Sequence, residues 1–317
     1  MLSIVPFAGI ISGFPLFLLT LFAVFLSGFS TALLQKACFG LASSFPSFSM
    51  HAFMTGQGIS GISVSLLLLV LKYSFDFEKK VVLKSVATLY FTITVVVVCI
   101  SLISYLYLRR LPIYKKYTHN LITVSDIVND NSKPQPIVVR QTMSQVFRQI
   151  RMPALYVFLV FFVTLLLLPY IWWVVPVSEN QLLRQLWVPI GFVVFDLGDV
   201  IGRSLPGLRL FLIRSVGVSG VLTVLRFLFL PVFMLSNLAP GLNALPSPIA
   251  YDSLFLLVIF LFAVTNGYYG SLIMMNTPGK VPPEDRENAG SVMTMALVWG
   301  VCLGVLAENI LLAIHKV

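Results

Sequence analysis

The stretch that decides the fold is Phe195-Asp196-Leu197-Gly198-Asp199-Val200-Ile201-Gly202-Arg203, in which ionisable side chains interrupt a largely apolar segment. A helix has 3.6 residues per turn, so Asp196, Asp199 and Arg203, at positions i, i+3 and i+7, project from one helix face. An ionised group deep in a membrane is costly, and such residues normally face a polar cavity or an ion-pair partner. These residues therefore form the candidate site. The alternative is an internal Asp199–Arg203 bridge that only locks two helices together.

The composition is typical of an integral membrane protein. Of the 317 residues, 58% are hydrophobic and only 10% are charged, whereas soluble domains average about half apolar and about a quarter charged. The expected fold class is therefore an all-α polytopic membrane protein. The net charge of +9 does not indicate a nucleic-acid partner, because the placement of Lys and Arg matters more than their sum in a membrane chain.

Chemistry-bearing residue types show no catalytic or metal-binding pattern. No ligand-like spacing links the three cysteines to the three histidines, so no metal ion, disulfide or cofactor is expected. No nucleophile, base and orienting group recur at a recognisable spacing, so the protein is not expected to be an enzyme.

Apolar runs predict eight full membrane helices and one fragment. The run from Leu2 to Leu34 contains no charged residue and exceeds the roughly 20 residues that one span needs. Pro15 is expected to break it, because proline disfavours helical geometry in the residue before it. A half-span at residues 2–13 would remain. The full helices are expected at residues 16–39, 51–73, 81–108, 152–175, 185–205, 210–237, 251–277 and 288–315.

The longest interruption between these helices lies at residues 109–150. Basic residues outnumber acidic ones there, so the positive-inside rule places this loop in the cytoplasm, where contact with anionic lipid is a further option. The expected organisation is an incomplete N-terminal helix bundle at residues 1–108, the basic loop, and a C-terminal five-helix bundle at residues 151–317. Alternating sides then place Lys280 and Arg286 near cytoplasmic turns and the C-terminus outside.

Further polar residues lie within the expected helices. Arg226 lies 12 residues beyond Arg214, about 18 Å deeper at the helical rise. Asn266 lies in an equally apolar span. Lipid offers such groups no hydrogen-bond partners, so Arg226 and Asn266 are expected to partner the Asp-bearing face. The small residues around Gln57 favour close helix packing over ligand contact, except at Gln57 itself.

Six motifs along the chain together resemble one transporter family. Phe195, Asp196, Asp199, Gly202 and Arg203 match the F-[ND]-x-x-D-x-x-G-R pattern that the equilibrative nucleoside transporter family carries on the eighth of its eleven helices. The other matches, in chain order, are Leu34-Gln35 with Phe39-Gly40-Leu41-Ala42, Met54-Thr55-Gly56-Gln57-Gly58, Arg226 before Phe229-Leu230-Pro231, Asn266-Gly267-Tyr268, and Pro283 with Ala289-Gly290. The resemblance covers nearly the whole chain from about residue 16.

The resemblance implies a major-facilitator-like helix bundle. Residues 2–13 would be the end of family helix 3, followed by helices 4–6 and, after the loop, helices 7–11. The first two helices and most of the third are missing from this count. A truncated, non-transporting membrane protein is therefore the alternative function. The residue types at Lys36 and Asp196 resemble those of the protozoan, kinetoplastid-like branch of the family. Membership of that branch would imply that uptake is coupled to protons. Purely equilibrative transport is left open.

The resemblance also implies roles for individual residues. The substrate would be a purine or pyrimidine nucleoside, with nucleobases as a further option, carried across the plasma membrane by alternating access. Asp199 accepts hydrogen bonds and Arg203 donates them, so the pair suits ribose hydroxyls. The resemblance implies that Gln35 hydrogen-bonds to the edge of the base. Lys36, Asp196, Arg226 and Asn266 would support the site or couple protons. Lys36 and Arg203 lie near helix ends, so snorkelling is an alternative for both. A heptahelical receptor is disfavoured by the helix count and the long central loop.

Overall fold

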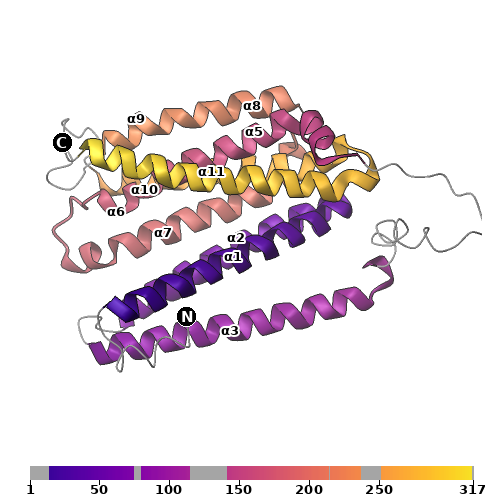
Figure 1. Cartoon of the computed structure of the whole chain (residues 1–317). Coiled ribbons are helices and arrows are strands. Elements are labelled where there is room, and N and C mark those ends of the chain that lie inside the picture. Colours follow the sequence, from indigo (N-terminus) through magenta and orange to yellow (C-terminus); the bar gives the residue numbers. More distant parts are fainter. Residues whose placement is uncertain (1–13, 75–79, 115–140, 214, 237–250, 316–317) are drawn as a thin grey trace, which may run out of the picture. The chain divides into compact units, whose positions relative to one another are not determined.

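A computed structural model describes residues 14–74, 80–114, 141–213, 215–236 and 251–315, which form helices and the turns between them (Figure 1). Within these residues, eight helical segments are long and apolar enough to cross a membrane. This confirms the all-α polytopic fold class. The half-span expected at residues 2–13 lies outside the described residues.

The chain divides into two compact units. The first comprises residues 1–37 and 71–140, and the second comprises residues 38–70 and 141–317. The first unit includes most of α1 (Phe14–Ser44) and α3 (Lys80–Arg110). The second includes most of α2 (Ser47–Ser74) and every helix from α5 onward. Residues 38–70 are thus grouped with the C-terminal helices, although they precede the central loop in sequence. The predicted division into an N-terminal bundle at residues 1–108 and a C-terminal bundle at residues 151–317 stays a prediction.

Three long helices of the second unit begin and end close to the expected residues. These are α7 (Gln181–Ser204), α10 (Asp252–Asn276) and α11 (Arg286–His315). The side chain of Asn180 caps α7 by accepting hydrogen bonds from the backbone N–H groups of Leu182 and Leu183, which is why this helix begins at Gln181 rather than at Gln185.

The helix expected at residues 152–175 differs at both ends. It begins nine residues earlier, as α5 (Met143–Leu167), because Thr142 and Gln145 form a capping box in which each side chain accepts from the other's backbone N–H. Residues 143–149 are therefore helical rather than part of a loop, and a kink at Ile150, whose φ of −111° and ψ of 18° are not helical, separates them from the span expected from residue 152. The helix ends before Pro169, after which one further turn, α6 (Tyr170–Trp173), follows.

The helix expected at residues 210–237 is divided. A short turn, η4 (Arg209–Phe211), precedes α8 (Val216–Leu225), and the tighter segment η5 (Arg226–Leu228) separates it from α9 (Phe229–Met234). Pro231 has no N–H group and cannot continue the α-helical ladder behind it. The break falls at Arg226, so this residue lies where the helix changes its winding.

Glycines allow α7 and α10 to pack backbone against backbone. A Cβ atom at Gly198 would lie 2.7 Å from the carbonyl oxygen of Phe260, and one at Gly267 would lie 2.8 Å from the backbone nitrogen of Arg203. A Cβ at Gly202 would similarly lie 2.8 Å from the nitrogen of Tyr268. Small residues at four-residue spacing permit such close helix approach in membranes. The contact positions the charged face of α7 against α10.

We expect Gly267→Ala to force α7 and α10 apart and to lower the free energy of unfolding by about 2–3 kcal/mol. The matched control is Gly270→Ala in the same helix, because a Cβ there would lie 3.7 Å from the Phe161 ring, an ordinary contact distance. Thermal melting of the purified protein measures the difference. Equal melting temperatures for the two variants would contradict this account of the helix pair.

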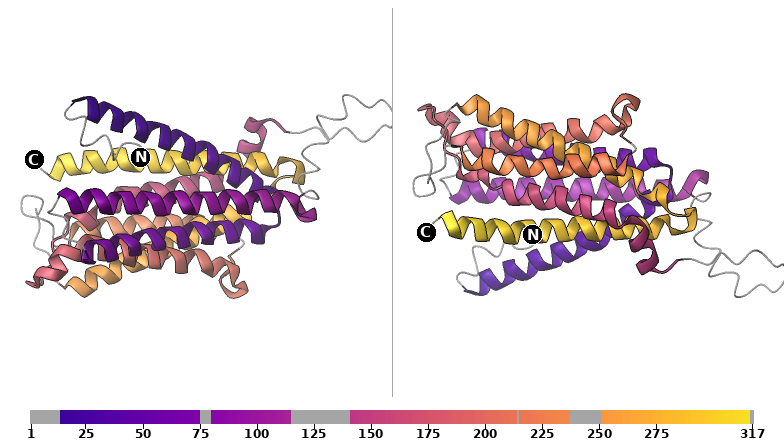
Figure 2. Two further views of the ribbon diagram at one scale, coloured as in Figure 1. Left: turned by 90° about the horizontal axis from the view of Figure 1, so that it is seen from below. Right: turned by 90° about the horizontal axis from the view of Figure 1, so that it is seen from above.

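The same device joins α5 and α11, which run side by side (Figure 2). A Cβ at Gly300 would lie 2.5 Å from the carbonyl oxygen of Phe158, and one at Gly304 would lie 2.7 Å from that of Phe162. The second unit is therefore built on two tightly packed helix pairs, α7 with α10 and α5 with α11.

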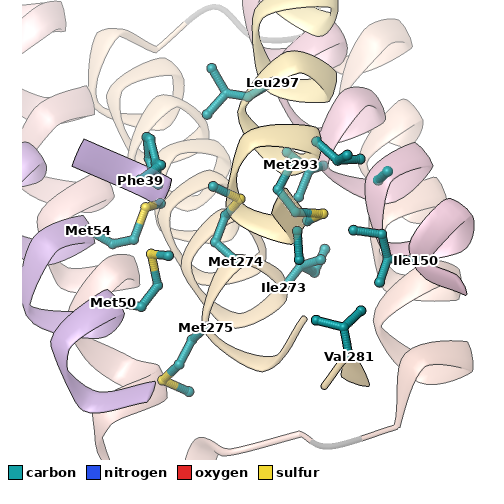
Figure 3. Close-up of a cluster of buried hydrophobic side chains, with 14 of the residues drawn as sticks. Phe39, Met50, Met54, Ile150, Ile273, Met274, Met275, Val281, Met293 and Leu297 are labelled. Atoms are coloured by element: carbon teal, nitrogen blue, oxygen red, sulfur yellow. The ribbon is translucent and has the colours of Figure 1, made fainter. Parts of the chain in front are cut away.

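A cluster of buried apolar side chains, here called the methionine cluster, joins these pairs to α2. Figure 3 shows Met50 and Met54 of α2 facing Met274 and Met275 of α10, with Met293 of α11 beside them. Methionine is unbranched and flexible, so it fills irregular gaps between helices. The cluster holds α2 on the helix pairs of the second unit.

Candidate functional site

The predicted charged face contains an ion pair within α7. Arg203 Nε donates to Asp199 Oδ2 at 2.5 Å, and the two side chains are only 11% and 8% exposed. The pair therefore links successive turns of one helix rather than two helices. Its low exposure shows that both groups point into the helix packing and not outward.

The second carboxylate oxygen of Asp199 is held by α10. Asn266 Nδ2 donates to Asp199 Oδ1 at 2.7 Å, and Asn266 Oδ1 lies 2.6 Å from the hydroxyl of Thr164 in α5. The single Thr164 hydroxyl proton can go to this amide or to the carbonyl of Val160 at 2.7 Å. Asp199, Asn266 and Thr164 are all buried. Each oxygen of the carboxylate is thus satisfied by a different neighbour.

Arg226 completes the network from the far side. Its side chain is 1% exposed, and its Nη2 donates to the Thr164 hydroxyl at 2.9 Å while its Nη1 donates to the carbonyl of Val160 at 2.7 Å. Nε lies 3.3 Å from the hydroxyl of Thr265. The guanidinium carbon lies 4.8 Å from the centre of the Phe262 ring, a favourable cation–π distance. Arg226 therefore reaches Asp199 indirectly, through Thr164 and Asn266.

Helix α2 approaches the ion pair from the opposite side. Arg203 Nη1 lies 3.3 Å from the carbonyl of Met54 and 3.4 Å from Gln57 Oε1. A Cβ at Gly58 would lie 2.9 Å from Arg203 Cδ, so the small residue permits this approach. Among the described residues, Arg203 Nη2 has no hydrogen-bond partner, so its N–H groups remain available to a ligand.

Asp196 lies on the same face of α7 and is half-buried. A Cβ at Gly61 would lie 3.2 Å from Asp196 Oδ1, and Ser65, whose hydroxyl donates to the carbonyl of Ile62 at 3.2 Å, lies near the carboxylate. Asp196, Asp199 and Arg203 thus all contact neighbouring helices, as the i, i+3, i+7 spacing predicts.

Three further polar residues contact the network, of which the sequence analysis had already singled out Gln57. Thr164, Thr265 and Gln57 contact the network, and the signal for each was a polar side chain in an otherwise apolar or small-residue span. Gln35 and Lys36 lie on α1 in the first unit, and their roles stay predictions.

Comparison with known proteins identifies the family. A family model described as a nucleoside transporter matches residues 21–311. The chain is 32% identical to human equilibrative nucleoside transporter 2, over 92% of this chain and 70% of that protein. It is 31% identical to the mouse equilibrative nucleoside transporter 2, over 91% of this chain and 70% of that protein. Identity to human equilibrative nucleoside transporter 1 is 26%, over 92% of this chain and 68% of that protein.

These matches confirm the resemblance stated from the motifs, and they agree with the expectation that the protein is not an enzyme. The assignment to a kinetoplastid-like branch and the missing first helices stay predictions. The network around Asp199 lies entirely within the matched residues, and the chain belongs to the nucleoside transporter family.

Proposed function

We propose that this protein carries nucleosides across a membrane by alternating access. It is a multi-pass membrane protein of the nucleoside transporter family, and its relatives are named equilibrative nucleoside transporters. The observation that carries the proposal is the Asp199–Arg203 pair, which is held within the membrane-spanning helices with donor groups of Arg203 still available.

The chemistry of the pair suits a ribose. A ribose hydroxyl both donates and accepts hydrogen bonds, whereas an ionised Asp199 only accepts and Arg203 only donates. Together they can satisfy neighbouring hydroxyls of one sugar. A ligand without those hydroxyls would leave the free donors of Arg203 without an acceptor, so the site would discriminate against it.

The base is assigned to a second group. We propose that the amide of Gln35, which has one acceptor and two donor positions, pairs with the base edge of a purine or pyrimidine. Lys36 is proposed to support this position, and the plasma membrane is the proposed location.

Uptake into liposomes tests the proposed function. The full chain, reconstituted into vesicles, is expected to accumulate radiolabelled uridine or adenosine in a saturable manner. 2′,3′-Dideoxyuridine is expected to enter at least about 10-fold more slowly, because each unsatisfied buried group is costly. Uptake equal to that of protein-free vesicles would instead favour a non-transporting membrane protein. Equal rates for uridine and its dideoxy analogue would remove the sugar from the site.

Asp196 supports a finer proposal, proton coupling. The charged groups on its own helix are Asp199 and Arg203, which are paired with each other, while α2 presents Gly61 and Ser65 to it. Asp196 is thus a carboxylate near the site that has no cation of its own among the described residues. Such a group is a candidate carrier of a transported proton.

The expected result is that uptake rises severalfold when the outside medium is made mildly acidic, and that Asp196→Asn removes this dependence. Initial uptake rates in buffers of different pH measure it. Glu179→Gln, at an exposed position, is the control and should keep the wild-type pH profile. An unchanged profile in Asp196→Asn would exclude this residue as the proton carrier.

A further inference from the structure

A pocket of about 470 Å³ lies in the second unit, away from the network around Asp199. One wall comes from the turn between α1 and α2, with Ser43, Ser47 and Met50, and the other comes from the turn between α10 and α11, with Asn276, Lys280 and Arg286. Met50 belongs to both the pocket wall and the methionine cluster of Figure 3. The pocket is therefore closed on one side by that cluster.

The charged groups that line the pocket are both cationic. They are Lys280, which is exposed, and Arg286, the first residue of α11. No carboxylate is among the described residues that line the pocket. The neighbouring Asp285 does not line the pocket; its Oδ1 accepts from the backbone N–H of Gln141, and its Oδ2 is buried with no hydrogen-bond partner among the described residues.

One donor of Arg286 has no acceptor. Its Nε is buried and has no hydrogen-bond partner among the described residues. Buried N–H groups in proteins are nearly always paired, with protein, water or a ligand. Arg286 Nε is therefore a donor open to an acceptor that lies outside the described residues, such as a bound ligand.

Some of the other hydrogen-bond donors at the pocket already have an acceptor within the protein. The Ser43 hydroxyl lies 2.6 Å from the carbonyls of Gly40 and Arg286, and the Asn276 amide donates to the carbonyl of Ile213 at 3.1 Å. By contrast, α2 begins at Ser47, and the first N–H groups of a helix have no acceptor within the helix and carry its positive dipole end. Of these, the N–H group of Ser49 donates to the carbonyl of Pro46 at 2.8 Å. The donors left for a ligand are Arg286 Nε, the Lys280 ammonium group and the N–H groups that precede Ser49, a set that favours an acceptor-rich, negatively charged ligand.

We propose that this pocket binds a phosphate group. Arg286 supplies the planar guanidinium that phosphate oxygens prefer, Lys280 supplies a second charge, and the start of α2 supplies backbone donors. The volume exceeds that of inorganic phosphate, so the phosphate belongs to a larger molecule, either the headgroup of an anionic lipid or a phosphorylated solute. Because a ligand there contacts both turns, it stabilises the arrangement in which they meet.

Thermal melting of the purified full chain in neutral detergent tests the proposal independently of transport. The probes are inorganic phosphate, glycerol 3-phosphate and short-chain phosphatidylglycerol, each compared with sodium chloride at equal ionic strength. We expect a saturable rise in melting temperature with at least one phosphate probe. A rise with the lipid alone identifies a headgroup, and a rise with glycerol 3-phosphate identifies a soluble ligand.

Two pairs of variants locate the site. A Cβ at Gly279 meets no atom within 4 Å, so Gly279→Asp adds a negative charge to the pocket wall while Gly279→Asn adds nearly the same volume without charge. Gly279→Asp should abolish the stabilisation and Gly279→Asn should keep it. Lys280→Gln should weaken apparent affinity by about 10-fold, and Arg184→Gln, an exposed arginine outside the pocket, should not.

Each remaining result would overturn the proposal. Stabilisation by sodium chloride equal to that by phosphate would identify a general salt effect. Equal stabilisation of Gly279→Asp and Gly279→Asn would place the bound phosphate elsewhere on the protein. No stabilisation by any probe would leave the pocket without a phosphate ligand.

Discussion

Replacing Asp199 with asparagine is expected to abolish nucleoside uptake while the protein still reaches the membrane. The substitution keeps the shape of the side chain and removes only its charge and one acceptor oxygen. Arg203 would then keep its positive charge without the carboxylate that lies 2.5 Å from its Nε, and the Asn266 amide would lose a charged acceptor at 2.7 Å. Uncompensated charge and lost ribose acceptors together should lower uptake by about 100-fold or more.

Initial rates of uridine uptake, normalised to surface protein, measure this effect. Glu179→Gln is the matched control, since it makes the same kind of change at an exposed position and should leave uptake near the wild-type rate. Asp199→Glu keeps the charge but moves it, and should recover little activity because both oxygens are fixed by neighbours. Wild-type uptake by Asp199→Asn would remove this residue from the substrate site.

Arg226→Gln is expected to destabilise the protein more than any other single change discussed. The wild-type guanidinium is 1% exposed and bonds to Thr164 and to the carbonyl of Val160. Glutamine is shorter and cannot bond both acceptors or face the Phe262 ring as a cation. The loss of charged hydrogen bonds in a buried site should cost about 3–5 kcal/mol. Melting of the purified protein should show a drop of many degrees.

Two variants separate charge from geometry in this prediction. Arg226→Lys keeps the positive charge but lacks the planar fork, so its melting temperature should lie between those of wild type and Arg226→Gln. Arg148→Gln, at an exposed position, should melt within about 1 °C of wild type, as surface substitutions usually do. Equal melting of Arg226→Gln and Arg148→Gln would show that Arg226 is not part of the buried network.

The helices themselves could be predicted because the membrane requires long apolar runs, and all eight full spans were expected. The predicted helix boundaries were wrong where a feature other than apolarity determines where a helix begins or ends. Residues 143–150 are amphipathic, with Val146 and Ile150 buried and Arg148 exposed. A capping box at Thr142, rather than hydropathy, starts this helix. The break at Arg226 could have been expected from Pro231, whose missing N–H interrupts the ladder.

The candidate site could be predicted in part. Helical spacing alone places Asp196, Asp199 and Arg203 on one face, and the structure shows that face in contact with neighbouring helices. The spacing says nothing about which residues of other helices meet it. Thr164 and Gln57 are far from Asp199 in sequence, and only the folded structure shows that they join the network, through hydrogen bonds to Asn266 and Arg203.

The glycine contact between α7 and α10 also constrains how the carrier can move. The backbones of the two helices are in contact at Gly198, Gly202 and Gly267. Rotation or sliding of one helix against the other would cause steric overlap, so the two helices are expected to move as one rigid body. On the α2 side the polar contacts of Arg203 are longer: its Nη1 lies 3.3 and 3.4 Å from neutral acceptors, and its carbonyl lies 3.5 Å from the Thr55 hydroxyl. If the proposed transport cycle separates helices, Asp199 and Arg203, the residues proposed to bind the ribose, are therefore expected to move together with α10.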